Sequence, residues 1–308
     1  MLLLRRTGRL LGIGGSVNAL VRPSAVATAV LLGVGLMGAP AASAAAAPAP
    51  ARLLVTVDHG RVHMPSSLRS ARYRFVVKAV GRADGVQLVK PDRGYTKDEF
   101  RADARRSDSR NRQVAKRAVR HMLDNIRFFG GVNAERGDKA VFWETLYTGR
   151  YWVLTQTSQR IREVRVHGSV RRTAMPAFDG TLRVRDGKIT AAPRVLPRHG
   201  KFLVRSTGTQ PHQLVLMRLA PGKTAADVKK FLRRLFEGDL TVLDEEPPMD
   251  LYAEPLGTGV LSPGTQYVQR YTLPRGNYAV LCFMPDLRDL DSLKIHFVKG
   301  EVGEVRVR

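Results

Sequence analysis

The chain contains very little cysteine and tryptophan. Among its 308 residues there is one Cys, Cys282, and there are two Trp. One thiol cannot form an internal disulfide, so packed apolar side chains must hold the fold together. In an exported protein, a single thiol is buried, paired with another chain or bound to a metal. The sequence also lacks paired-cysteine zinc motifs, a Gly-rich phosphate loop and a Ser nucleophile elbow, which argues against those enzyme classes.

Acidic residues are scarce as well. The chain has 27 Asp and Glu against 51 Lys and Arg, for a formal net charge of +24. The few carboxylates show no spacing that singles out a general acid and base, so the sequence predicts no enzyme. Basic residues are dense in one stretch, at Arg101, Arg105, Arg106, Arg110, Arg112, Lys116, Arg117 and Arg120. They spread over more than one face of a helix. This indicates either a solvated helix or a basic surface for anionic wall polymers, lipid headgroups or nucleic acid. An exported protein meets the first two more readily, so we expect no specific nucleic acid as partner.

The N-terminal stretch predicts export. Four arginines precede an apolar run from Ala25 to Met37, and Ala42-Ser43-Ala44 follows as a small-residue cleavage pattern. We therefore expect a signal peptide over residues 1–44 and an Ala/Pro-rich disordered stretch over 45–52. The apolar run is short for a membrane span, although an uncleaved anchor is the alternative. Cleavage would leave a secreted or extracytoplasmic chain with no transmembrane span and a net charge of about +20.

The rest of the chain is an internal repeat. At an offset of 127 residues, Gly60 matches Gly187, Phe75 matches Phe202, and the match continues through Gly149 and Gly276. A duplication that keeps its glycines and strand residues keeps its fold. We expect one domain over 53–167, a linker over 168–180 and a second domain over 181–308.

Short alternating segments predict strands in both copies, for example at 72–80, 140–147, 266–273 and 277–283. Thr96 with Glu99 predicts the start of a helix that reaches about Asp124, and Thr224 begins another that Gly238 ends. Several short strands with one helix inserted midway predict a two-sheet sandwich in each copy.

Three segments of the second copy carry a family resemblance. They are Pro211-His212-Gln213, the run Gly276-Asn277-Tyr278 through Cys282-Phe283-Met284-Pro285-Asp286, and His296 to Glu301. These segments resemble the cupredoxins, the plastocyanin-like blue-copper proteins, and in particular secreted bacterial cupredoxin-like proteins. The resemblance covers 181–308 and reaches 53–166 through the repeat. It implies a mainly β protein of two tandem cupredoxin-like Greek-key β-sandwich domains, each with one inserted helix.

The resemblance implies a copper site formed by His212, Cys282 and His296, with Glu301 at the axial position. Copper that carries one electron favours a thiolate, two imidazoles and a weak axial ligand. Two features depart from the family. Thirteen residues separate Cys282 from His296, where a plastocyanin has only a few. Glu301 would also be a hard anionic ligand, which favours Cu(II) and lowers the reduction potential.

Each residue also has a plainer interpretation. Cys282 has apolar neighbours, and Cys is among the residues most often buried, so the alternative is a buried thiol without a metal. His212 and His296 would then be hydrogen-bonded imidazoles and Glu301 a carboxylate at the rim. The first copy has Asp84 and Thr155 where the second has His212 and Cys282, so we expect it to be metal-free.

The sequence therefore predicts an exported binding or electron-carrier module with a mononuclear copper site in the second domain. The alternative is an extracytoplasmic scaffold or adhesion protein that binds anionic envelope polymers through its basic surface. Multicopper oxidases repeat the same kind of domain but need His-x-His ligand pairs, and the sequence has none. The redox partner is not indicated.

Overall fold

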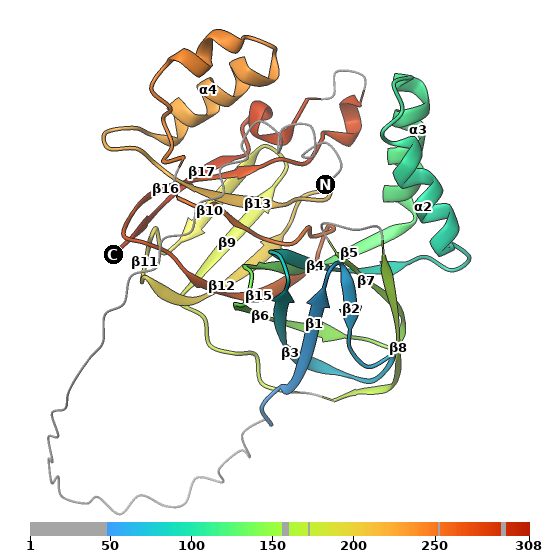
Figure 1. Ribbon diagram of the computed structural model, residues 1–308. Helices are drawn as coiled ribbons and strands as arrows, with labels where there is room; N and C mark the ends of the chain where they lie inside the picture. Colours follow the sequence, from blue (N-terminus) through green and yellow to red (C-terminus); the bar gives the residue numbers. More distant parts are fainter. Residues whose placement is uncertain (1–47, 156–159, 172, 252, 291–293) are drawn as a thin grey trace, which may run out of the picture. The chain divides into compact units, whose positions relative to one another are not determined.

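The computed structural model describes residues 48–155, 160–171, 173–251, 253–290 and 294–308 (Figure 1). The predicted signal peptide lies outside the described residues. Residues from Pro48 to Arg308 form one compact unit.

The first half consists of eight strands and two helices. In chain order these are β1 (Ala51–Asp58), β2 (Arg61–His63), β3 (Ser67–Val80), β4 (Asp84–Pro91), α2 (Lys97–Arg106), α3 (Arg112–Asp124), β5 (Ile126–Ala134), β6 (Lys139–Leu146), β7 (Gly149–Thr155) and β8 (Ile161–Arg171). Strand β1 starts two residues before the domain boundary expected at residue 53, and β8 extends four residues into the expected linker.

The described part of the second half follows a similar order, with nine strands, one α-helix and three 3-10 helices. They are β9 (Gly180–Arg185), β10 (Lys188–Ala192), β11 (Val195–Leu196), β12 (His199–Ser206), β13 (Leu214–Arg218), α4 (Ala225–Phe236), η1 (Leu240–Asp244), β14 (Leu256–Gly257), β15 (Gln266–Thr272), β16 (Gly276–Cys282), η2 (Leu287–Asp289), η3 (His296–Lys299) and β17 (Val302–Val307). The prediction of a mainly β protein built on sandwich layers is confirmed.

The strands form two sheets. A 12-stranded sheet contains all eight strands of the first half together with β9, β10, β12 and β15, and a five-stranded sheet has the order β11-β17-β16-β13-β14. Long strand β3 joins the layers of the first half, because its start pairs with β8 and its later part with β1 and β6. A bulge lies at Ser70, between these two parts. The equivalent residue of the second half is Pro197, which has no N–H to donate, and there the strand divides into β11 and β12 in separate sheets.

The pairing register repeats at the offset read from the sequence. In the first half Phe75 pairs with Leu53 and Phe142, and in the second half Phe202 pairs with Gly180 and Gln269, each 127 residues later. The paired glycines also agree, since Gly149 has φ 143° and Gly276 has φ 153°. Such agreement is what a duplication predicts.

The halves are joined through one ladder and one core. Strand β6 pairs with β15, placing Trp143 opposite Val268 and Phe142 opposite Gln269. The ring of Phe142 stacks on Phe75 and meets Tyr267 edge to face. The largest cluster of buried apolar side chains therefore extends through both halves.

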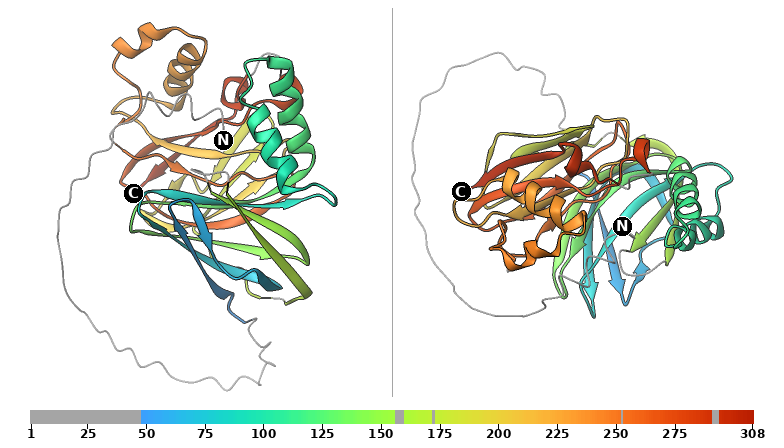
Figure 2. Two further views of the ribbon diagram at one scale, coloured as in Figure 1. Left: turned by 45° about the vertical axis from the view of Figure 1, so that its right-hand side comes forward. Right: turned by 90° about the horizontal axis from the view of Figure 1, so that it is seen from above.

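Capping boxes begin α2 and α4, as predicted. The side chains of Thr96 and Thr224 each accept a hydrogen bond from the backbone N–H three residues later. In turn, the carboxylates of Glu99 and Asp227 accept from the backbone N–H of the capping threonines. The helical stretch expected to reach Asp124 is divided into α2 and α3, which lie side by side (Figure 2). The break falls at Ser107-Asp108-Ser109, residue types that favour helix ends, and Asn111 caps α3.

Helix α4 covers the five-stranded sheet. Val228 and Leu232 pack with Ala279, Leu281 and Phe297 in a second apolar cluster. Within the described residues, no helix is both long and apolar enough to span a membrane.

Candidate metal centre

All four predicted ligands converge at one edge of the five-stranded sheet. Strand β16 is antiparallel to both of its neighbours, β13 and β17. Its last residue therefore lies beside the starts of the other two. Cys282 ends β16, His212 precedes β13 by two residues and Glu301 precedes β17 by one. His296 begins η3, in the connection between β16 and β17.

The ligand atoms face one another. The Cys282 Sγ lies 3.8 Å from the His212 Nδ1 and 3.4 Å from the His296 Nδ1. The Glu301 Oε2 lies 2.9 Å from the first of these nitrogens and 3.3 Å from the second. One ligand atom from each residue lies within 4.8 Å of all the others, and all four residues are buried. Among the described residues this is the one group of its kind.

These separations fit a shared metal ion. With bond lengths of about 2.0–2.3 Å and angles of about 110–120°, a nitrogen and a sulfur bound to the same ion stand about 3.5–3.8 Å apart. Of the observed Sγ to Nδ1 distances, 3.8 Å lies within this range and 3.4 Å lies just below it. The other ring nitrogen of His296, Nε2, is not one of these ligand atoms; it is buried and has no hydrogen-bond partner among the described residues. The cluster is thus shaped to hold a metal through both Nδ1 atoms and the thiolate.

The loop that carries His296 is fixed by packing. Phe297 is fully buried and meets the rings of Phe236 and Phe283. The loop turns back at Gly300, which has φ 109°, a value that favours glycine. The Glu301 N–H then donates to the His296 carbonyl at 3.2 Å, so the two residues are held together.

A further layer of hydrogen bonds orients the cluster. His212 Nε2 lies 3.2 Å from the Asp186 Oδ1, so the imidazole has Glu301 at one nitrogen and Asp186 at the other. The Gly187 N–H donates to Glu301 Oε1 at 3.1 Å, and the Gln213 N–H donates to the Cys282 Sγ at 3.5 Å. Such outer contacts set ligand orientation and metal affinity.

At Gly208 the backbone packs directly against the Asp186 carboxylate and the His212 imidazole. A Cβ atom there would stand 2.3 Å from the Asp186 Oδ1 and 2.5 Å from the His212 Nε2. Any larger residue would separate the carboxylate from the imidazole, so glycine is required for this contact.

The protonation of the cluster follows from its burial. Burial, reinforced by the Glu301 carboxylate, raises the pKa of the Cys282 thiol well above its ordinary value. Burial also acts to raise the pKa of Glu301, but hydrogen bonds from His212 and His296 outweigh it and lower that pKa to about 2. A neutral thiol therefore faces an ionised carboxylate, and a metal cation would have to displace the thiol proton.

The structure places Glu301 differently from the expectation of a carboxylate at the rim. Its side chain is 1% exposed and lies between the two imidazoles. Asp186 was not expected at the site, although it belongs to the repeated segment. Its Asp-Gly pair predicts only the turn between β9 and β10. Its contact with His212 forms only because the β9–β10 turn packs against the segment before β13, and local sequence does not predict that packing.

The first half has the same backbone frame with other side chains. Val86 pairs with Thr155 there, as Leu214 pairs with Cys282 in the second half. Thr155 thus occupies the position of Cys282, as the alignment indicated. The first half also has eleven residues after Thr155 where the second has the long loop that carries His296.

No family model and no curated protein matches the chain. Solved structures similar to it include a dithionite-reduced auracyanin from Roseiflexus castenholzii, at 17% identity and TM-score 0.26, covering 42% of this chain and 94% of that one. Auracyanin A from Chloroflexus aurantiacus, described as a "blue" copper protein, matches at 10% identity and TM-score 0.23, covering 42% and 99%. A multicopper oxidase matches at 8% identity and TM-score 0.23, covering 83% and 88%. TM-scores this low carry no argument about the site, so its interpretation rests on the geometry of the four side chains.

Proposed function

We propose that the protein binds one copper ion through His212, Cys282 and His296, with Glu301 as a fourth ligand, and acts as an exported electron-carrier or binding module. The observation that carries this proposal is the approach of two imidazole Nδ1 atoms to one buried thiol at 3.4 and 3.8 Å. A soft thiolate with two imidazoles is the donor set of mononuclear electron-transfer copper sites.

Each side chain has a distinct role in this proposal. Bound copper would supply reversible one-electron chemistry. Cys282 gives up its proton on binding, and the Gln213 N–H stabilises the resulting thiolate. Glu301 is already ionised and contributes the negative charge that a divalent cation requires. Burial of all four residues keeps water from the site and limits rearrangement between charge states.

Copper loading of the purified full chain tests the proposal. We expect about one copper per chain and a visible thiolate-to-copper band. Cys282→Ser should abolish the band and weaken copper binding by at least about 100-fold, because losing a ligand costs more than losing an outer contact. His199→Gln removes an exposed imidazole outside the cluster and serves as the matched control. A coloured Cys282→Ser protein would show that the ligand assignment is wrong.

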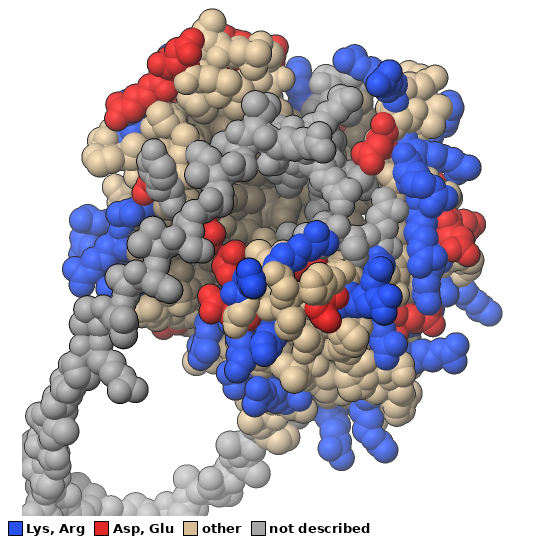
Figure 3. Space-filling view, viewed as in Figure 1, with Lys and Arg blue, Asp and Glu red and all other residues tan. Residues whose placement is uncertain are grey.

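The alternative function is a scaffold without metal, and one observation favours it. Glu301 accepts hydrogen bonds from both imidazoles and from Gly187, so the polar cluster is largely satisfied by itself. In that case the basic surface would do the binding. Figure 3 shows Lys and Arg side chains gathered on the side where α2 and α3 lie. A purified chain that takes up neither copper nor zinc would favour this scaffold function.

Export remains part of the proposal, supported by the sequence pattern that ends at Ala42-Ser43-Ala44. N-terminal sequencing of the protein recovered from its native host should give a chain that begins near Ala45. Recovery of Met1 from that material would contradict cleavage.

A further inference from the structure

A second site lies where the two halves share their sheet. A pocket of about 520 Å³ opens beside the β6–β15 ladder, with walls from β5, β6, β12 and β15 and from residues 175–176 of the connection between the halves. This volume is in the range of small-molecule sites. None of the four proposed metal ligands lines this pocket, although Gly208, which packs against His212, does.

The pocket is positively charged. Arg72, Arg127 and Arg205 line it, and none of the three has an ion-pair partner within the described part of the chain. Arg72 donates to the Thr145 hydroxyl and the Thr173 carbonyl, so its guanidinium is held in place. Planar guanidinium groups recognise carboxylates and phosphates in a bidentate manner.

Two buried polar groups in the wall have no protein partner. Glu144 Oε2 and Ser206 Oγ make no hydrogen bond among the described residues, although each residue lines the pocket and is more than nine-tenths buried. Leaving a buried polar group unpaired is costly, so a polar ligand group that reached these oxygens would be stabilised by them. Burial raises the pKa of Glu144 well above its ordinary value, against the opposing effects of the Thr145 N–H and Arg72, and so favours the neutral form of this carboxyl.

The remaining walls are aromatic. Phe129 and Trp143 line the pocket, and Tyr147 stands at it with 54% of its surface exposed. The Arg127 guanidinium lies 5.7 Å from the centre of the Phe129 ring, so charge and aromatic surface are adjacent. Flat apolar walls beside fixed cations suit an aromatic ring that carries an acidic group.

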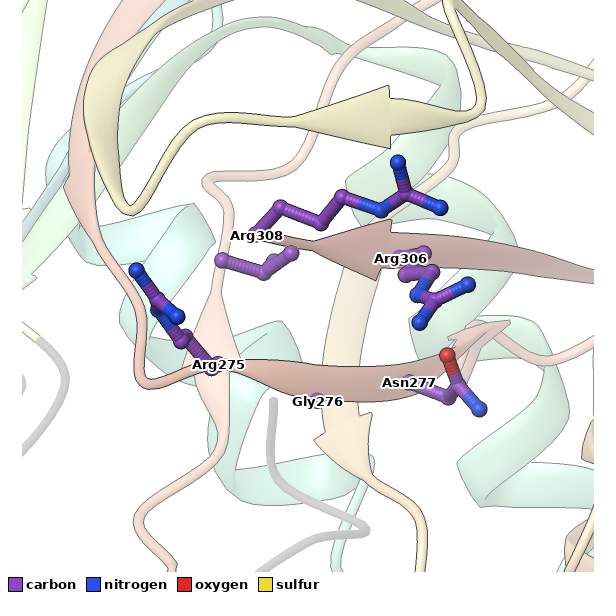
Figure 4. A pocket seen from close by; sticks show the side chains of 6 residues that line it. Arg275, Gly276, Asn277, Arg306 and Arg308 are labelled. Carbon is purple, nitrogen blue, oxygen red and sulfur yellow. The ribbon is translucent and has the colours of Figure 1, made fainter.

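Within the described residues, a second pocket is also lined by arginines but lacks buried, unpaired polar groups. Arg275, Arg306 and Arg308 surround a surface depression of about 460 Å³ (Figure 4). None of its lining side chains is among the buried, unpartnered polar groups of the described residues. Charge alone does not define a ligand there.

We propose that the pocket at the β6–β15 ladder is a binding site for a small aromatic carboxylate. Its acidic group pairs with Arg72, Arg127 and Arg205, its ring lies against Phe129 and Trp143, and a polar substituent pairs with Glu144 and Ser206. The site is separate from the proposed copper ligands and does not depend on them.

Titration calorimetry of the full chain at low ionic strength tests this, with benzoate, salicylate and phthalate as probes and Trp fluorescence as a second readout. At least one probe should bind with a dissociation constant below about 1 mM and change the tryptophan fluorescence, because Trp143 lines the pocket. Arg205→Gln and Ser206→Ala should each weaken binding about tenfold, because each removes a hydrogen bond to the ligand. Arg270→Gln, which removes an exposed charge from β15 outside the pocket, should leave binding unchanged.

Three outcomes would overturn the proposal. Inorganic phosphate that binds as tightly as the best probe would mean that the aromatic walls take no part. Benzyl alcohol that binds as tightly would mean that the arginines take no part. Absence of binding by all three carboxylates would mean that the pocket is not such a site.

Discussion

Asp186 is the carboxylate outside the four proposed ligands that contacts one of them, His212, directly. Its carboxylate stands 3.2 Å from the His212 Nε2, on the far side of the imidazole from the sulfur. Asp186→Asn should weaken copper binding about 10–100-fold, as loss of such an outer partner does. It should also raise the reduction potential, because a nearby negative charge stabilises the oxidised ion. Chelator competition and spectroelectrochemistry measure both, with the exposed Asp244→Asn as control; unchanged values would make Asp186 a bystander.

Asp286 shows how one carboxylate stabilises the loop between the ligands. It is buried and lies 2.6 Å from the Lys299 Nζ and 3.3 Å from the Arg288 Nε. Burial acts to raise its pKa, but Lys299 and the hydrogen bonds around it lower the pKa far below the ordinary carboxyl range. Asp286→Asn should therefore reduce the free energy of unfolding at pH 7 by about 2–3 kcal/mol.

The pH dependence of that loss has a definite sign. A depressed folded-state pKa stabilises the fold above the unfolded-state pKa, and this stability is lost as the pH falls through the folded-state value. The difference between wild type and Asp286→Asn should thus be full at neutral pH and shrink below about pH 4. Denaturant unfolding at several pH values measures it, and a difference that grows on acidification would contradict the ion-pair explanation.

The four side chains lie together for a physical reason. Cys282, His212 and Glu301 each lie within two residues of a strand end, and neighbouring antiparallel strands bring those ends to one edge. The family resemblance singles these residues out, and the strand pattern explains why they can converge. Asp186 and Gly208 escaped prediction because their contact with His212 joins two turns distant in sequence. The full burial of Glu301 escaped as well, since it depends on η3 packing beneath α4.

At the scale of elements, the 127-residue sequence offset predicts strand positions but not where a strand is interrupted. The same strand is continuous as β3 in one half and divided into β11 and β12 in the other, with Pro197 at the division. The pairing partners are equivalent in the two halves, so the difference lies in strand continuity, and Pro197 has no N–H to donate at the division. The break between α2 and α3 is of the same kind. Ser107 to Asn111 favour helix ends, whereas the Ala/Arg pattern on either side continues unbroken.

Helices α2 and α3 supply the test of the basic surface. Arg110, Arg112 and Arg117 are exposed and have no ion-pair partner among the described residues. If this surface binds anionic polymers, retention on an anionic matrix should fall steeply between about 0.05 and 0.5 M salt as the charges are screened. Replacing the three with Gln should release the chain at lower salt. The matched control replaces three exposed arginines of the second half with Gln: Arg183, Arg185 and Arg270. If both triple variants elute at the same salt concentration, retention depends on net charge and not on this surface.

At the scale of the whole described chain, the two halves share one hydrophobic core. The β6–β15 ladder and the contact of Phe142 with Tyr267 make one core of both halves. Tyr267 is fully buried, its hydroxyl donates to Gln269 and accepts from the Gly259 N–H, and its ring fills the space above Gly130. Separating the halves would expose this aromatic surface and break the ladder.

We therefore expect both halves to unfold in a single transition. The two tryptophans, Trp143 and Trp152, report on the first half, whereas Cys282, buried in the second, reports through its reactivity toward a thiol reagent. In a guanidinium titration of the metal-free chain, tryptophan fluorescence and pulse labelling of Cys282 should give the same midpoint, as coincident probes do for a cooperative unit. Tyr267→Ala should lower both midpoints together, by about 3–5 kcal/mol of unfolding free energy, because it removes a large buried ring. Midpoints that separate in the wild type would show instead that the halves are autonomous domains joined by a weak interface, and the boundaries at 53–167 and 181–308 would then mark true folding units.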